Sequence, residues 1–340
     1  MDLSTTYLGL DLRSPLVASP GPLTGKIDSL RALEAAGIAA VVLPSLFEEQ
    51  VIHDEMSTSA LFDVDQGNPE ASSYFPDLQG IESISDRYLR HVEEAKRVLE
   101  IPVIASLNGV SADGWERYAR LIQDAGADAL ELNLYRVAAD VDTSGSAIEA
   151  EQLDLVRAVD EVTYIPLAVK VSPYYTAFGH FAARLVAVGA DALVLFNRFY
   201  QPDIHPQTRA VVPALELSSP SELRLPLRWL GMLHGRLSAD LAATTGIHTG
   251  LDAARALLAG ADVTMMTSAL LRYGPSQVST VEQALVAWGT EHGYASVAEL
   301  RGSASQANVA DPAAFERANY VQGLIDFANS FQSAQGHGPW

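Results

Sequence analysis

A Gly-Ala-Asp motif followed by an apolar run recurs along the chain. It occurs at residues 126–128, 189–191 and 260–262, and a weaker version precedes the apolar run Ala40–Leu43. Each copy predicts a helix end, a glycine able to take the left-handed conformation, a short turn and a buried strand. Repeated use of this turn in one chain predicts parallel strands covered by helices.

The remaining apolar runs complete a set of strands. Ile101-Pro102 and Ile165-Pro166 each open one, because proline is tolerated at the first residue of a strand. With two further runs, the predicted strands are 16–19, 40–44, 103–107, 129–133, 167–171, 192–196, 240–244 and 263–266. Helical patterns lie between them at 27–36, 114–124, 147–162, 178–188 and 251–258. This alternation predicts an α/β fold, a (β/α)8 TIM barrel. An open doubly wound sheet is the alternative, but no Gly-x-Gly-x-x-Gly follows the first strand.

The motif spans most of the 340 residues, which predicts one barrel over residues 1–310. Before the first strand of this barrel, residues 7–12 predict a small hairpin that closes the barrel bottom. After the barrel, Asp311-Pro312 predicts a helix start, so residues 311–340 are expected to form a helix and tail packed on the barrel. Long connections at 45–80 and 197–236 leave the carboxyl ends of strands, where we expect lids or binding loops. The second is rich in proline and is expected to be extended or hairpin-like.

Charge and composition exclude several functions. The formal net charge is −20, from 42 acidic and 22 basic side chains, so we expect no binding to nucleic acid or to membrane surfaces. The chain has no cysteine, which excludes disulfides, thiolate catalysis and an iron–sulfur cluster of its own. No secretory signal or membrane span is visible, and we expect a cytoplasmic protein.

Polar residues end most of the predicted strands. Because buried polar groups need partners, this ring predicts a ligand with many hydrogen-bonding groups. Asn108, Asn133 and Asn197 add amides that both donate and accept, as a flat heterocycle requires.

Lys170 interrupts a strand that is otherwise apolar. Three interpretations stay open: a structural salt bridge to Glu131, Schiff-base chemistry, or a fixed positive charge beside a cofactor such as a flavin.

The last two strands end in small polar residues. Thr244-Thr245-Gly246 and Thr267-Ser268 predict a phosphate site, as is frequent after strands 7 and 8 of such barrels. His53, His205 and His248 have no metal-ligand spacing, and no metal is predicted.

In this order, the segments resemble the dihydroorotate dehydrogenase family, nearest the soluble class 1 enzymes and the dihydroorotate dehydrogenase-like proteins. The matching segments are 18–21, 106–111, 131–134, 169–175, 196–197, 245–247, 249–250, 267–270, 274–275 and 293–297. The resemblance implies an FMN-dependent oxidoreductase of pyrimidine metabolism, with the flavin at the barrel top, and a homodimer. It places Lys170 beside the N1–O2 edge of the flavin and the phosphate on Gly246, Thr267 and Ser268. Ala18, Ser19 and Gly21 would line the ring, Asn133 and Asn197 would contact ring or substrate, and Ser45, Asn108 and Thr245 complete the expected cofactor site.

The sequence departs from the family where the proton of the substrate is removed. Arg136 stands at the position of the usual cysteine or serine base, Ala138 at that of a substrate asparagine, and Pro44 at that of a lysine. Arginine is not a base at ordinary pH. We therefore expect hydride transfer between a small anionic substrate and the flavin, with Lys170 stabilising the reduced ring and Arg136 binding the anion. Tyr135 and Tyr74 are the candidate replacement bases.

Electrons would leave through a soluble acceptor or a partner protein, because the chain has no cysteine for an iron–sulfur relay. Two alternatives stay open. One is a non-catalytic flavin-binding or accessory subunit of a redox complex, and the other is a lysine-dependent aldolase.

Overall fold

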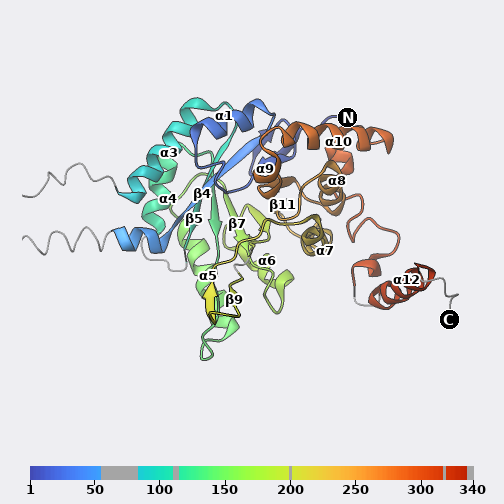
Figure 1. Cartoon of the computed structure of the whole chain (residues 1–340). Helices are drawn as coiled ribbons and strands as arrows, with labels where there is room; N and C mark the ends of the chain where they lie inside the picture. Colours follow the sequence, from blue (N-terminus) through green and yellow to red (C-terminus); the bar gives the residue numbers. More distant parts are fainter. Residues whose placement is uncertain (55–82, 110–114, 199–200, 317–318, 335–340) are drawn as a thin grey trace, which may run out of the picture.

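The computed structural model describes residues 1–54, 83–109, 115–198, 201–316 and 319–334. Eight parallel strands form a closed barrel in the order β11-β12-β3-β4-β5-β6-β7-β8. Figure 1 shows β4, β5 and β7 of this barrel with helices around them. The strands are β3 (Leu16–Ala18), β4 (Ala40–Phe47), β5 (Val103–Asn108), β6 (Ala129–Asn133), β7 (Leu167–Val171), β8 (Ala192–Leu195), β11 (Asp240–Ala243) and β12 (Val263–Met266). The predicted (β/α)8 barrel is confirmed, and the open-sheet alternative is wrong.

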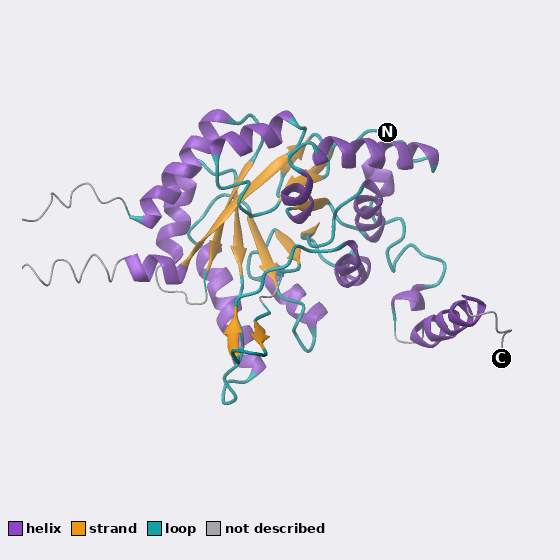
Figure 2. Cartoon of the chain, viewed as in Figure 1, coloured by secondary structure: helices purple, strands orange, loops and turns teal. Residues whose placement is uncertain are grey.

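Helices surround the barrel, and Figure 2 shows them outside the strands. They are α1 (Ile27–Ala35), α3 (Ile84–Val98), α4 (Trp115–Asp124), α5 (Gly145–Asp160), α6 (Phe178–Ala187), α7 (Arg224–Leu233), α8 (Gly250–Ala259), α9 (Ser268–Tyr273), α10 (Gln277–Glu291) and α11 (Val297–Leu300). A large apolar core fills the layer between helices and strands, and a smaller one fills the barrel interior. The polar strand ends therefore stand at the open carboxyl end of the barrel.

The Gly-Ala-Asp motif joins neighbouring strands through its aspartate. The glycines take φ values of +91°, +114° and +121° at Gly126, Gly189 and Gly260. The aspartate carboxylates then accept a backbone N–H at the start of the neighbouring strand: Asp128 from Val103 at 2.7 Å, Asp191 from Leu167 at 2.8 Å, and Asp262 from Leu241 at 2.7 Å. In each pair the aspartate N–H donates back to the carbonyl of the same residue. The motif therefore fixes how adjacent strands start relative to each other.

A hairpin of β1 (Thr5–Tyr7) and β2 (Leu10–Leu12) covers the amino end of the barrel, as predicted. Its two-residue turn has positive φ at Leu8 and Gly9, which matches the twist of a tight hairpin. Tyr7, Leu8 and Leu12 are buried and pack into the barrel interior. Leu8 N–H donates to Asp240 at 2.8 Å, which fastens the hairpin to β11.

Both long connections leave the carboxyl end of the barrel. Residues 197–236 contain the antiparallel hairpin of β9 (Asp203–His205) and β10 (Ala210–Val212), the 3-10 turn η3 (Pro220–Leu223) and α7, which confirms the hairpin-like prediction. Most of the predicted loop 45–80, including Tyr74 among its residues, lies outside the described residues.

The C-terminal segment begins as predicted and ends in a helix. Asp311 accepts the N–H of Ala313 at 3.0 Å and caps the turn η4 (Pro312–Phe315). This turn packs closely on α7, since a Cβ at Gly231 would collide with the Phe315 ring. Beyond it, α12 (Asn319–Ala334) is exposed over residues 320–330. That residues 311–340 pack on the barrel as a unit stays a prediction. None of the described helices is both long and apolar enough to cross a membrane.

Candidate active site

A cavity of about 340 Å³ opens at the carboxyl end of the barrel. Residues 19–22 after β3, Lys170 of β7, the end of β8, residues 215–218, residues 244–247 after β11, and the start of α9 line it. This is the size of a small-molecule site, and it lies where barrel enzymes carry theirs.

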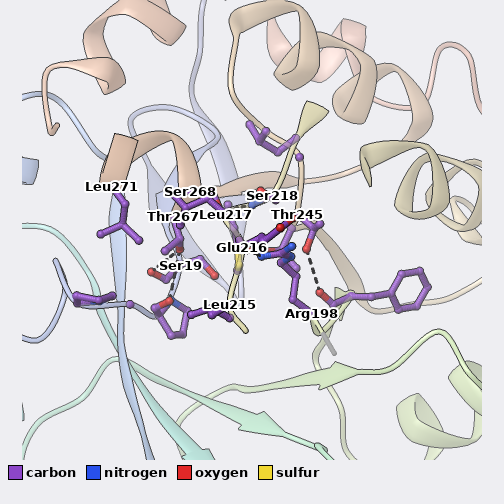
Figure 3. Close-up of a pocket in the computed structure, with 18 of the residues that line it drawn as sticks. Ser19, Arg198, Leu215, Glu216, Leu217, Ser218, Thr245, Thr267, Ser268 and Leu271 are labelled. Carbon is purple, nitrogen blue, oxygen red and sulfur yellow. Dashed lines mark hydrogen bonds between the residues drawn. The ribbon is translucent and has the colours of Figure 1, made fainter. Parts of the chain in front are cut away.

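One wall of the cavity is a close contact between the β3–α1 loop and the end of β12. The Thr267 hydroxyl donates to the Ser19 carbonyl at 3.1 Å, which Figure 3 shows on one side of the cavity. A Cβ at Gly21 would lie 2.7 Å from Cγ2 of Thr267, so only glycine fits there. Ala18, just before this loop, is fully buried in β3.

The turn after β11 forms the opposite wall and has an unusual backbone. Thr245 and Gly246 have φ of +75° and +82°. A β-branched residue in this region is strained, typically by about 1–3 kcal/mol, and such strain often accompanies ligand sites. A Cβ at Gly246 would lie 2.6 Å from the backbone N of Leu223, so η3 presses directly on this turn.

The segment at 215–218 is tied to the start of α9. The N–H of Ser218 donates to the Ser268 hydroxyl at 2.9 Å, and the Ser218 hydroxyl lies 3.3 Å from Nε2 of His248. His248 is buried, and burial, followed by the nearby Arg272 guanidinium, lowers its pKa below the usual 6.5. A neutral His248 therefore supports this side of the cavity.

Lys170 is buried in the cavity wall and is paired with Glu131. Its Nζ lies 3.4 Å from Oε1 of Glu131, and both residues are buried. The salt bridge that the sequence offered as one interpretation is therefore present. Because Lys170 also lines the cavity, the same ammonium is available to a bound anion.

The three strand-end asparagines take different roles. Oδ1 of Asn133 is buried without a hydrogen-bond partner among the described residues, and Asn133 is not among the residues that line the cavity. Asn197 instead donates from Nδ2 to the Leu134 carbonyl at 3.3 Å and lines a neighbouring cavity of about 330 Å³. Asn108 is buried at the end of β5.

The sequence matches one protein family over most of its length. Residues 3–288 match the family model described as dihydroorotate dehydrogenase. The chain belongs to the dihydroorotate dehydrogenase family. This family is one of flavin-dependent oxidoreductases, and the lysine-dependent aldolase alternative is wrong.

The relatives carry the names of several dehydrogenases. "Dihydroorotate dehydrogenase B (NAD(+)), catalytic subunit" of Thermoplasma volcanium is 25% identical over 313 residues, 89% of this chain and 98% of the relative. "NAD-dependent dihydropyrimidine dehydrogenase subunit PreA" of Escherichia coli K12 is 25% identical over 329 residues, 89% of this chain and 77% of the relative. "Putative dihydroorotate dehydrogenase A (fumarate)" of Aeropyrum pernix is 26% identical over 236 residues, 67% of this chain and 74% of the relative.

Ser45 lies near the top of β4 but outside the cavity wall. A register shift between Val42 and Ser45 interrupts the pairing of β4 with β5. The Ser45 hydroxyl pairs with that of Ser106 at 2.7 Å, and the Tyr88 hydroxyl accepts the Ser106 N–H at 2.7 Å. Ser45 thus helps to shape β4 and β5 at this point, and its contact with a cofactor stays a prediction.

The loop that carries Tyr135 and Arg136 does not line the cavity in the described part of the structure. The Arg136 guanidinium pairs with Glu151 of α5, and neither Arg136 nor Tyr135 is among the described residues that line the cavity. The Tyr135 N–H donates to the Asn133 carbonyl at 3.0 Å. The anion-binding role of Arg136 stays a prediction that requires its release from Glu151.

The structure brings Arg198 to the cavity, and the sequence interpretation gave this arginine no role in the site. Its guanidinium donates to Glu222 at 3.2 Å and to the Glu216 carbonyl, and Figure 3 shows it beside Thr245. Its position directly after Asn197, at the end of β8, was the available signal. Leu215 and Leu217 were missed because nothing in the sequence shows that this loop folds back over the barrel.

Proposed function

We propose that this protein binds FMN in the cavity and transfers hydride between a small anionic substrate and the flavin. The buried Lys170 ammonium in the cavity wall is the observation that carries the proposal. A buried lysine needs an anion or a chemical role, and Glu131 alone, at 3.4 Å, is a long contact for an ion pair.

The residues of the site fit an FMN molecule. Gly246, Thr267 and Ser268 surround the part of the cavity that would hold the phosphate, where a Cβ on Gly246 has no room. Ala18, Ser19 and Gly21 would lie along the ring. The Oδ1 of Asn133, which has no partner among the described residues, would accept a ring or substrate N–H. Asn108 at the end of β5, Asn197 after β8 and Thr245 after β11 would complete the site.

The residues of the chain would divide the work of the reaction. When bound, the flavin supplies a ring that accepts a hydride. Lys170 would place a positive charge beside that ring and so favour the electron-rich form. Arg136 would bind the substrate anion as the sequence suggests, and Arg198, which already faces the cavity, is the second cation that can do so. Tyr135 is the replacement base proposed from the sequence.

The route of the electrons is part of the proposal. A soluble acceptor or a partner protein would reoxidise the flavin, because the chain holds no cysteine ligand for an iron–sulfur cluster. Two of the three relatives reported above are named as subunits, which supports a partner protein. A homodimer and a cytoplasmic location complete the proposal.

A non-catalytic flavin-binding subunit is the second candidate. Arg136 at the position of the family's base, turned to Glu151, is the observation that favours it. Under this candidate the cavity binds FMN but turns over no substrate.

Photoreduction followed by oxidant and substrate panels separates the two candidates. The purified protein is loaded with FMN, reduced by light and mixed with quinones, fumarate and NAD⁺, and the oxidised protein is mixed with dihydroorotate and dihydropyrimidines. An enzyme reoxidises with at least one acceptor and is reduced by at least one substrate, and a protein inert in every mixture is the accessory subunit. Absence of flavin binding rejects both candidates.

A further inference from the structure

The residue Glu131 lies under the proposed flavin site without reaching it. It is fully buried in the barrel interior on β6, whereas Lys170 on the adjacent strand β7 lines the cavity. The register places Asn133 opposite Lys170, so Glu131 stands two residues deeper in the barrel. A ligand in the cavity therefore interacts with Glu131 only through the electric field of the Glu131 carboxylate and through Lys170.

The carboxylate of Glu131 has few partners to share its charge. Oε1 lies 3.4 Å from the Lys170 Nζ, and Oε2 is buried without a hydrogen-bond partner among the described residues. A buried carboxylate left with one cationic partner is costly if that partner is removed. Its negative charge therefore acts mainly on Lys170 and on whatever Lys170 faces.

We propose that Glu131 is a positioning residue that holds the Lys170 ammonium and partly neutralises its charge at the flavin ring. This inference rests on the proposed function. Lys170 alone would strongly favour the reduced, electron-rich flavin. Glu131 opposes that effect, so the pair sets how readily the flavin passes its electrons on.

The first experiment uses FMN-loaded protein at pH 7, poised with a reductant against a reference dye. The E131Q variant keeps the shape of the side chain and removes its charge. At a fixed poise, the ratio of reduced to oxidised FMN is expected to rise at least tenfold over wild type. A ratio within threefold of wild type, or a lower one, overturns the inference.

Two control variants separate charge from packing. E131D keeps the charge on a shorter chain and is expected to stay within threefold of wild type, and a rise equal to that of E131Q assigns the effect to packing and overturns the inference. D262N removes another buried carboxylate, one paired with Arg301 at the amino end of the barrel, and is expected to leave the ratio within twofold.

A second experiment needs no flavin. In urea unfolding of the apoprotein, K170M leaves the Glu131 carboxylate buried alone, so the double variant E131Q/K170M is expected to unfold at higher urea than K170M. If the loss of stability in the double variant equals the sum of the losses in E131Q and K170M, the two side chains are not coupled. That result overturns the inference and leaves the proposed function intact. Failure of FMN to bind, by contrast, rejects the proposed function itself.

Discussion

The carboxylate of Asp191 accepts the backbone N–H of Leu167 at 2.8 Å, and the N–H of Asp191 returns a bond to the Leu167 carbonyl at 2.9 Å. This reciprocal pair fastens the start of β7 to the residue just before β8. Asp128 and Asp262 repeat it with Val103 and Leu241. The recurring Gly-Ala-Asp motif therefore fixes where adjacent strands begin relative to each other. It thereby also fixes the relative positions of the strand ends that carry the site.

Removal of one such carboxylate should weaken the barrel measurably. We expect D191A to lower the free energy of unfolding by about 1–2 kcal/mol, because the Leu167 N–H loses a charged acceptor. Urea denaturation measures the change. D154A is the control, since Asp154 holds only an exposed pair with Arg157, and it should shift stability by less than about 0.5 kcal/mol. Equal effects for the two variants would refute the role given to Asp191.

The strained Thr245 offers a stabilising substitution. T245G should relieve about 1–3 kcal/mol of backbone strain and add about 0.5–1 kcal/mol of chain entropy cost, for a net gain near 1 kcal/mol. Thermal unfolding of the apoprotein measures it. At the preceding position, T244G removes a buried side chain with no positive φ to relieve and should destabilise. A loss of stability in T245G contradicts the strain argument.

The close packing of Leu223 against Gly246 should make this glycine necessary for FMN binding. We expect G246A to weaken FMN affinity at least tenfold, since its Cβ would lie 2.6 Å from the Leu223 backbone N and must displace the turn. G235A is the matched control: its φ of +73° is equally left-handed, but the space around it is open. If both variants bind FMN equally well, the turn does not form the cradle.

Stability should depend on pH through His248. Burial lowers its folded pKa below the unfolded value of 6.5, so the unfolded chain binds more protons between these two values. The resulting stability is present above pH 6.5 and is lost as the pH falls through the folded pKa. Unfolding free energies of wild type and H248Q, measured from pH 7.5 to pH 5, should converge as the pH falls. Parallel curves would show that His248 is not the group responsible.

A substrate assay distinguishes Arg136 from Arg198 as the residue that binds the substrate anion. Once a substrate is known, R136A should raise KM at least tenfold if Arg136 leaves Glu151 to bind the anion. If Arg198 binds it, R198A raises KM and R136A does not. Steady-state kinetics decides, and unchanged KM in both variants removes the arginines from substrate binding.

The sequence predicted the barrel because its strands and turns are local patterns. All eight strands lie within a few residues of their predicted positions, and the glycines of the repeated motif have positive φ as expected. It also named Glu131 as the partner of Lys170, because both stand on strands predicted to be buried.

Long-range side-chain choices were not predictable. The pairing of Arg136 with Glu151 depends on how a loop meets α5, and the Asn197 amide turns to the Leu134 carbonyl because that acceptor happens to lie within reach. The fold of residues 215–218 over the cavity follows from contacts with α9 that no local pattern encodes.

Titration of the purified apoprotein with FMN, followed by flavin fluorescence and absorbance, tests the central claim most directly. The account predicts one FMN per chain, with weaker binding in K170M and G246A. Absence of saturable binding by wild-type protein would contradict it.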